Sequence, residues 1–283
     1  MTENVSIYVP TYNAEKTITF SIEAILNQTL LPNQIIIIND CSSDNTLKKI
    51  NIYKNKIEIV NNEINRGLGY CRNLGLEMSK NNLVASIDSD VVPEKDWLKN
   101  LYDCLKKNNS AYCGGKLIEK NIDNNIYNKW RSIHLIQHWG ERSMQNPPFI
   151  YGCNNLLNKE KIFKKIYYDE NLKTNGEDVD FSGKLSINKL STFYDHKAIC
   201  YHIQNDNMNS LSKRYWRYRT YGYKIKSFSY LKLIKLSIKE VKMLLNRIIK
   251  DLKYKKYDLL FLEIIIYFKF VMYEFNETII KRR

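Results

Sequence analysis

The chain has 283 residues, 44% of them hydrophobic and 26% charged, which suffices for one large α/β domain with a smaller appendage. Six widely spaced cysteines without a C-x-x-C pair argue against a zinc or disulfide framework and favour a reducing, cytoplasmic location; no signal peptide is expected. The net charge of +14 is uneven, because residues 205–283 hold 19 Lys and Arg against 7 Asp and Glu, and residues 1–204 are therefore close to neutral.

The first hundred residues alternate strand and helix signals, which predicts βα units on a parallel sheet. Short apolar runs predict buried strands at 5–9, 34–39, 57–60 and 83–87. Helical spacing of apolar residues predicts helices at 15–27, 44–53 and 67–79. Ser43 or Asp44 is the expected N-cap of the second helix.

The pattern loosens after residue 110. We expect strands at 110–117, 150–157, 191–194 and 198–203, and a helix at about 177–189, with a polar and aromatic stretch at 120–148. From about residue 211 the period is helical. The most apolar piece, 259–273, contains Glu263 and Lys269 and is too short for a clean transmembrane span.

Polar groups follow three of the predicted strands at the point where each strand ends. Pro10-Thr11-Tyr12-Asn13 follows the first, Asn39-Asp40 the second and Asp88-Ser89-Asp90 the fourth. Ligands of open α/β sheets bind outside the carboxyl ends of the strands, although turn chemistry alone explains any one of these groups. Two carboxylates two residues apart can hold a divalent cation through oxygen ligands, with a solvated turn as the alternative.

The chain resembles family-two inverting glycosyltransferases, whose fold is called GT-A. The resemblance covers about residues 4–204. Its motifs are Pro10-Thr11-Tyr12-Asn13, Asn39-Asp40 with Ser42-Ser43-Asp44, Asn65-Arg66-Gly67, Arg72-Asn73-Leu74-Gly75, Asp88-Ser89-Asp90, Gly152-Cys153-Asn154-Asn155, and Glu177-Asp178 with Asp180.

The resemblance implies a nucleotide-sugar donor, Mn²⁺ or Mg²⁺ as cofactor, and a role for each matching residue. Thr11 would contact the donor, Asp40 the base, Arg72 the base or phosphates, and Asp88 the ribose. Asp90 would ligate the metal. The remaining donor-binding residues are Pro10, Tyr12, Asn13 and Ser89, and the acceptor side holds Gly152, Asn154 and Glu177.

The resemblance further implies that Asp178 is the general base and His202 a second metal or diphosphate ligand. An inverting transfer needs one base opposite the leaving group. Asp178 also fits a helix N-cap or first-turn acid, and His202 in its apolar strand also fits a core histidine. Two positions depart from the family pattern: Asn39 replaces an acid, and Cys153, which often is Gly, is expected to reshape the acceptor side.

Other signals are set aside. Gly67-Leu68-Gly69 lacks the third glycine of a dinucleotide fingerprint, and His134 and His138 lack the Glu of a zinc helix. The basic, tyrosine-rich segment 213–226 has no nucleic-acid-binding motif beside it, so no nucleic acid partner is expected.

We therefore expect a GT-A-like domain at 1–204 and a basic helical extension at 205–283. The expected reaction is inverting transfer of a hexose or N-acetylhexosamine from a UDP-sugar to a glycan or lipid-linked acceptor. The extension either lies peripherally on an anionic membrane surface or packs on the catalytic domain or a second subunit. Alternatives are a catalytically inactive nucleotide-sugar-binding relative and a basic nucleic-acid-binding protein.

Overall fold

The computed structural model describes residues 4–162, 166–220 and 230–276, so part of the basic segment 213–226 and the last seven residues lie outside the described residues. It divides into two compact units. The α/β unit is formed by residues 1–120 and 137–204, and the helical unit by residues 121–136 and 205–283. A segment from the middle of the chain thus belongs with the C-terminal helices.

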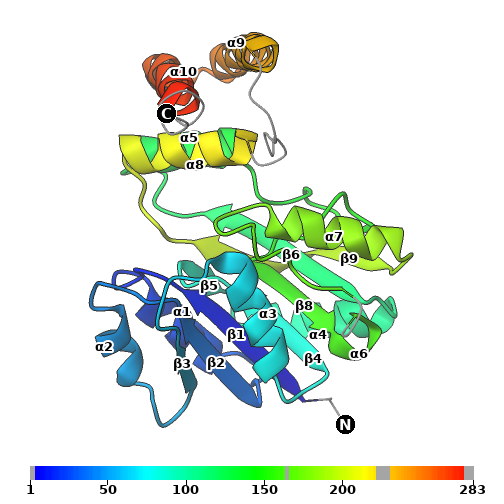
Figure 1. The fold of residues 1–283 in the computed structure, drawn as a ribbon. Helices are drawn as coiled ribbons and strands as arrows, with labels where there is room; N and C mark the ends of the chain where they lie inside the picture. The colour runs from blue at the N-terminus through cyan, green and yellow to red at the C-terminus, as the bar shows by residue number, and fades with distance from the viewer. Residues whose placement is uncertain (1–3, 163–165, 221–229, 277–283) are drawn as a thin grey trace. The chain divides into compact units, whose positions relative to one another are not determined.

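The α/β unit is built on one mixed sheet, labelled in Figure 1. Its neighbouring strands run in the order β3-β2-β1-β4-β8-β6-β9-β5, and β7 pairs with β9. The strands are β1 (Val5–Thr11), β2 (Gln34–Asn39), β3 (Glu58–Asn61), β4 (Leu83–Ile87), β5 (Val91–Pro93), β6 (Tyr112–Glu119), β7 (Met144–Gln145), β8 (Asn154–Asn158) and β9 (Thr192–His202). The first four are parallel, as predicted, while β8 runs antiparallel to both β4 and β6.

The helices of the α/β unit cover both faces of this sheet. They are α1 (Ile18–Leu26), α2 (Thr46–Asn51), α3 (Leu68–Met78), α4 (Trp97–Lys107), α6 (Lys159–Ile162) and α7 (Glu177–Ile187). The N-cap of helix α2 is Asn45, whereas Ser43 or Asp44 was expected. Asp44 lies one residue before this cap, and its Oδ1 accepts a hydrogen bond from the Thr46 amide at 3.0 Å.

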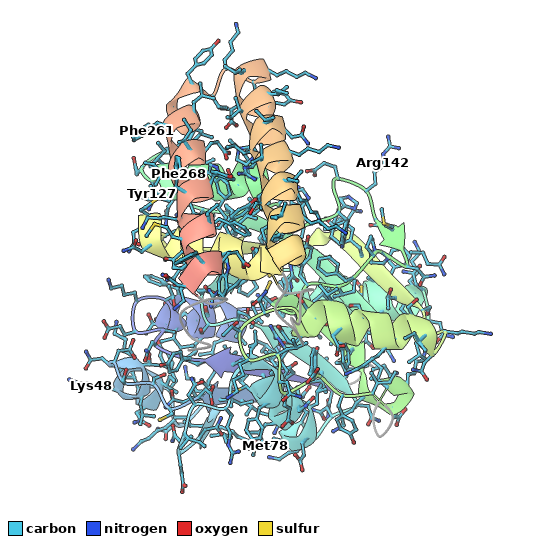
Figure 2. All side chains as sticks on the ribbon, turned by 45° about the horizontal axis from the view of Figure 1, so that its top comes forward. Lys48, Met78, Tyr127, Arg142, Phe261 and Phe268 are labelled. Atoms are coloured by element: carbon cyan, nitrogen blue, oxygen red, sulfur yellow. The ribbon has the colours of Figure 1, made fainter. Side chains whose placement is uncertain are left out.

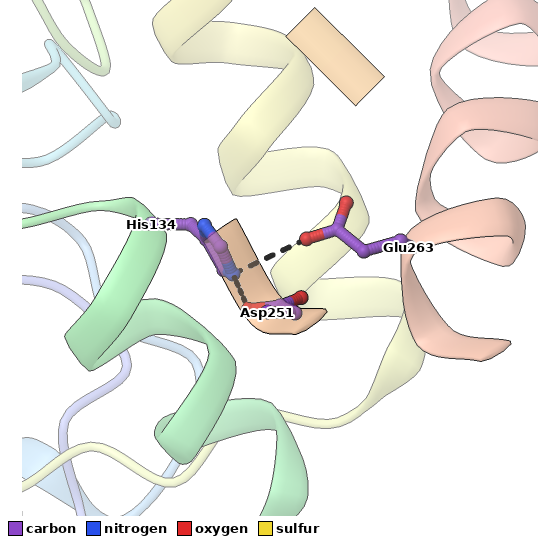
Figure 3. A group of neighbouring side chains, drawn as sticks. All are labelled: His134, Asp251 and Glu263. Carbon is purple, nitrogen blue, oxygen red and sulfur yellow. Dashed lines mark hydrogen bonds and ion pairs between the residues drawn. The ribbon is translucent and has the colours of Figure 1, made fainter. Parts of the chain in front are cut away.

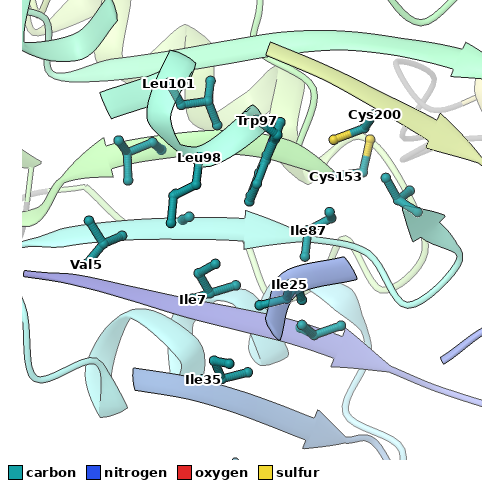
Figure 4. Packing of buried hydrophobic residues seen from close by; sticks show 14 of the residues in the cluster. Val5, Ile7, Ile25, Ile35, Ile87, Trp97, Leu98, Leu101, Cys153 and Cys200 are labelled. Atoms are coloured by element: carbon teal, nitrogen blue, oxygen red, sulfur yellow. The ribbon is translucent and has the colours of Figure 1, made fainter. Parts of the chain in front are cut away.

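Alternation along the strands explains the two covered faces. In β2, Ile35 and Ile37 join a core with residues of α1, α2 and α4, whereas Ile36 and Ile38 join a second core with residues of α3, α6 and α7. Figure 4 shows the first core, where Trp97 and Leu98 of α4 pack over the strands. Since successive strand residues point to opposite faces, continuous apolar runs predict a sheet buried on both sides.

The last strand differs from the prediction. Residues 192–202 form one strand, β9, instead of two short ones. Its pairing with β6 shifts register opposite Gly115 and Lys116, between the partners Asp195 and Ile199. The polar residues at this bulge interrupt the apolar pattern while the backbone stays extended.

The helical unit contains α5 (Ile126–His134), α8 (Met208–Thr220), α9 (Tyr230–Lys253), a short 3₁₀ turn at Tyr257–Leu259, and α10 (Leu260–Phe275). Its core is a cluster around Trp130 of α5, Tyr215 of α8 and Phe270 of α10. None of the helices among the described residues is long and apolar enough to cross a membrane.

Candidate active site

The loops that follow β1 and β2 are tied together at the carboxyl edge of the sheet. Asn13 Oδ1 accepts a hydrogen bond from the Ser43 amide at 2.9 Å, and the Asn13 amide donates to Ser42 Oγ at 3.0 Å. Asn13 has a φ of 48°, a left-handed conformation that Asn tolerates better than most residues. Tyr12 is 53% exposed beside it. An aromatic ring on a fixed loop is therefore open to a ligand at this edge.

Asp40 is buried and anchors the neighbouring loop. Its Oδ1 accepts hydrogen bonds from Asn62 Nδ2 at 2.7 Å and the Arg66 amide at 2.9 Å, and its Oδ2 accepts from the Gly67 amide at 2.8 Å. These hydrogen bonds fix the carboxylate against the loop that follows β3.

Arg72 of α3 joins three segments that are far apart in the sequence. It is 1% exposed, and its Nε donates to Glu177 Oε1 at 2.9 Å, its Nη1 to the Gly152 carbonyl at 2.8 Å, and its Nη2 to Asp88 Oδ1 at 3.1 Å. Nη1 also donates to Ser86 Oγ at 2.9 Å. The structure thus makes Arg72 the residue that orients the groups around it.

Asp88 and Asp90 both lie partly exposed at the end of β4, and Ser89 between them accepts a hydrogen bond from Ser21 at its carbonyl. Burial raises the pKa of Asp88, Arg72 opposes this, and the negative charge of Asp90 adds to the rise. Asp90 Oδ2 lies 3.0 Å from His202 Nε2. Two acids and a histidine are therefore grouped at one end of the strand.

Glu119 is a member of this group that the sequence analysis did not find. Its Oε2 lies 3.0 Å from His202 Nδ1, and the two residues are direct partners in the β6–β9 pairing. Burial opposes protonation of His202, but the charges of Asp90 and Glu119 raise its pKa overall. The signal was hidden because cross-strand partners 83 residues apart have no pattern in a single sequence.

These residues fit a divalent cation. A histidine that ligates a metal through one ring nitrogen usually donates the other N–H to a carboxylate, and His202 Nδ1 lies 3.0 Å from the Glu119 carboxylate. Adjacent ligands of an octahedral ion with bonds of about 2.1 Å lie about 3 Å apart. The Asp90 and His202 atoms have this separation, and Asp90 remains partly exposed.

Glu177 and Asp178 open helix α7 and face different surroundings. Glu177 is 2% exposed; burial and the neighbouring charge of Asp178 raise its pKa to about 7, although Arg72 opposes this. Asp178 is half-buried, with Oδ2 accepting from the Gly152 amide at 3.1 Å and Oδ1 from the Val179 amide at 2.8 Å. Burial raises its pKa as well. Asp178 is the member of the pair that solvent reaches.

The contacts correct the role expected for Asn154 and show where Cys153 and Thr11 lie. Asn154 is fully buried and its amide bonds Trp97 Nε1 and the Lys116 carbonyl, so it serves the core and not the acceptor side. Cys153 packs in the core of the α/β unit, where Figure 4 labels it. Thr11 is 2% exposed, and its hydroxyl donates to the Val9 carbonyl.

The other predicted positions lie at the site's edge or within it. Pro10 is buried in β1, and Gly152 sits where any Cβ would lie 2.6 Å from Arg72 Nη2.

Of the set-aside histidines, His134 ends helix α5, so His138 does not share a helix with it. All six cysteines are free thiols.

The sequence and the fold of the chain match a known family. The model of glycosyl transferase family 2 matches residues 6–167 of the chain. The chain therefore belongs to glycosyl transferase family 2, and its α/β unit has the GT-A fold.

Individual relatives support the same family. The chain is 27% identical over 232 residues to a poly-beta-1,6-N-acetyl-D-glucosamine synthase of Staphylococcus epidermidis, covering 79% of this chain and 55% of the relative. It is 34% identical over 112 residues to an Escherichia coli UDP-Glc:alpha-D-GlcNAc-diphosphoundecaprenol beta-1,3-glucosyltransferase, covering 39% of this chain and 44% of that protein. The chain thus spans about half the length of these curated relatives or less.

Among solved structures, residues 1–349 of S. aureus TarS in complex with UDP-GlcNAc match with a TM-score of 0.53 and 20% identity, covering 83% of this chain and 70% of that one. GalNAc-T7 with UDP, GalNAc and Mn²⁺ matches with a TM-score of 0.57 and 16% identity, covering 72% and 44%. These likenesses bear on the fold alone.

Proposed function

We propose that this protein transfers a hexose or N-acetylhexosamine from a UDP-sugar to a glycan or lipid-linked acceptor, with inversion at the sugar carbon. Family membership and relatives named for nucleotide-sugar chemistry support the reaction class. The observation that carries the proposal is the shared arrangement of Asp88, Asp90, Arg72 and Asp178 around the carboxyl end of β4.

In this proposal the donor lies across the ends of β1, β2 and β4. Asp40 accepts an N–H of the base, and Tyr12 and Asn13 border the nucleotide. Asp88, held by Arg72, reaches the ribose hydroxyls. Four hydrogen bonds tie Arg72 to protein groups, so its proposed contribution is to fix Asp88 and Glu177.

Asp90 and His202 would hold Mn²⁺ or Mg²⁺, with Glu119 orienting the histidine ring. When bound, the ion offsets the negative charge that develops on the leaving diphosphate. Mn²⁺ in a GT-A neighbour supports a divalent ion of this type.

Asp178 is the proposed general base. Its two hydrogen bonds come from backbone amides of Gly152 and Val179, which fix the carboxylate without filling all its acceptor positions. Its raised pKa brings the carboxylate closer in basicity to the hydroxyl it must deprotonate. Glu177 is buried and bonded to Arg72, so it positions the neighbouring groups instead.

Hydrolysis of nucleotide sugars without an acceptor tests this function. A panel of UDP-, GDP- and TDP-sugars is incubated with Mn²⁺, and released nucleoside diphosphate is measured. We expect release from a UDP-sugar that stops when the metal is chelated. No release from any donor, together with binding of an oligonucleotide, would favour the nucleic-acid alternative instead.

A further inference from the structure

Three helices of the helical unit are joined by a buried network of polar side chains, shown in Figure 3. His134 Nε2 lies 3.0 Å from Asp251 Oδ1 and 3.3 Å from Glu263 Oε1. The side chains of all three are at most 2% exposed. Helices α5, α9 and α10 thus meet at one point inside the unit.

This network already has its own positive charge, which disfavours a metal ion among its acids. Arg247 Nε donates to Glu263 Oε2 at 2.6 Å, and Trp130 Nε1 donates to Glu263 Oε1 at 2.6 Å. Lys250 follows close by, with its Nζ donating to the Ile133 carbonyl at 2.8 Å. Two cations therefore accompany the two carboxylates, and a divalent ion would add uncompensated charge to a buried site.

Helix α9 carries a second apolar face opposite the one it buries. At about 100° per residue, its exposed apolar side chains fall within an arc of about 80°, while the buried Leu236, Glu240 and Arg247 lie on the other side of the helix. The exposed residues are Ile234, Ile238, Val241, Leu245, Ile249 and Leu252, each 40–65% exposed.

Helix α10 repeats this arrangement. Leu262, Ile266 and Phe270 point into the core of the unit, while a separate row of apolar residues remains in solvent. That row is Phe261, Ile264, Phe268, Val271, Met272 and Phe275. Figure 2 labels Phe261 and Phe268, which are 73% and 62% exposed, on the outside of this helix. We call the two exposed rows together the outer face.

The acidic and the basic residues around the outer face differ in their exposure to solvent. Residues 230–276 contain five acids, and four of them, Glu240, Asp251, Glu263 and Glu274, are buried. The fifth, Asp258, pairs with Lys129 at 2.6 Å. The exposed lysines of α9, by contrast, follow one edge of its apolar row: Lys235, Lys239, Lys242 and Lys253.

We infer that the outer face docks on the surface of an anionic lipid bilayer. A helix with an apolar row bordered by lysines can lie in the headgroup region, where the apolar side chains leave water and the lysines meet lipid phosphates. A second copy of this chain is the weaker fit, because lysines would meet lysines and every acid of this segment is already buried or paired. The docking deepens the proposed function, on which its purpose rests, by holding the enzyme on the membrane that carries a lipid-linked acceptor.

Co-sedimentation with vesicles tests the docking without any transfer reaction. The full chain is mixed with phosphatidylcholine vesicles with and without phosphatidylglycerol, at low and high salt. We expect binding that requires phosphatidylglycerol and weakens with salt. Phe261→Asp and Phe268→Asp should each weaken binding at least about tenfold, because burying a Phe is worth this much or more.

Charge-reversal substitutions test the lysines along the apolar row of α9 separately from the Phe residues. Lys235→Glu with Lys242→Glu should weaken binding at least about 25-fold, from roughly one factor of five per lysine. Ile52→Asp and Lys48→Glu are matched exposed controls in the α/β unit and should bind as the wild type does. Circular dichroism melting checks that each variant is folded.

Two results would overturn the docking. One is wild-type protein that stays in the supernatant with anionic vesicles. The other is unchanged vesicle binding in the Phe variants together with a smaller oligomer by light scattering, which would assign the outer face to a second copy. Acceptor-free hydrolysis of a UDP-sugar by the wild type is measured alongside. If hydrolysis fails while vesicle binding holds, the proposed function is wrong and the docking stands.

Discussion

Arg72 shows how a residue of the family motif works in this protein. The family resemblance placed it near the base or phosphates, but its guanidinium is buried and bonded to Asp88, Glu177, Ser86 and Gly152. The buried charge is compensated by two carboxylates, and removing one partner of such a pair typically costs about 3–5 kcal/mol. The motif is therefore a positioning device as much as a binding one.

Gly152 should tolerate no side chain. A Cβ at this position would lie 2.6 Å from Arg72 Nη2, and the hydrogen bonds of Arg72 prevent the guanidinium from moving aside. We expect Gly152→Ala to destabilise the protein by about 1–3 kcal/mol, as overpacking does, measured by denaturant unfolding.

Gly183→Ala is the matched control for this substitution. Nothing lies within 4 Å of its Cβ, and it sits inside helix α7. Alanine should therefore stabilise the helix by about 0.5–1 kcal/mol. Equal effects of both substitutions would show that the contact with Arg72 does not constrain Gly152.

Asp178→Asn isolates the proposed base. The amide keeps the size of the side chain and an oxygen for the Gly152 amide, but it cannot take a proton. We expect UDP-sugar affinity to hold while the transfer rate falls about 100- to 10,000-fold. Glu177 becomes the better candidate for the base if the variant loses donor affinity and keeps its rate.

At the scale of elements, the sequence predicts the parallel half of the sheet well. Strands β1, β2 and β4 are continuous apolar runs buried on both faces, and such runs are recognisable without any partner. Helix α5 was not predicted, because its buried face depends on Tyr215, Phe270 and other residues more than 80 positions away. The Glu119–His202 pair was not predicted for the same reason, because the pairing of β6 with β9 brings the two residues together.

The buried network of the helical unit should be sensitive to acid. Burial, with Lys250 and Arg247 nearby, lowers the pKa of His134 from 6.5 to about 3. Below pH 6.5 His134 is therefore protonated in the unfolded chain but not in the folded chain, and the free energy of unfolding falls as the pH drops toward 3. The loss can reach a few kcal/mol.

The variant His134→Gln separates this effect from the other carboxyl groups. Its amide nitrogen can still donate to Asp251 but does not titrate in this range. Unfolding by denaturant, followed by helical circular dichroism from pH 7 to 4, should show a smaller loss in the variant than in the wild type. Parallel losses would mean that His134 does not carry the acid sensitivity.

At the scale of the whole molecule, the two units have different chemistry. The α/β unit gathers acids and a histidine at one sheet edge, whereas the helical unit buries most of its described acids and exposes apolar residues and lysines. The uneven charge of the sequence pointed to a distinct C-terminal part, but it did not show that residues 121–136 belong with the C-terminal helices. It left open what the C-terminal helices face, because composition does not tell which apolar row is buried: α9 and α10 each have two.

The most direct test of the central claim is calorimetric titration of the full chain with UDP, in Mn²⁺ and after chelation, for the wild type and Asp90→Ala. We predict that the wild type binds UDP and that either removing the metal or substituting Asp90 weakens binding by about 10- to 100-fold or more, with the melting temperature nearly unchanged. Absence of UDP binding, or equal affinity under all of these conditions, would contradict the proposed metal-assisted nucleotide-sugar site.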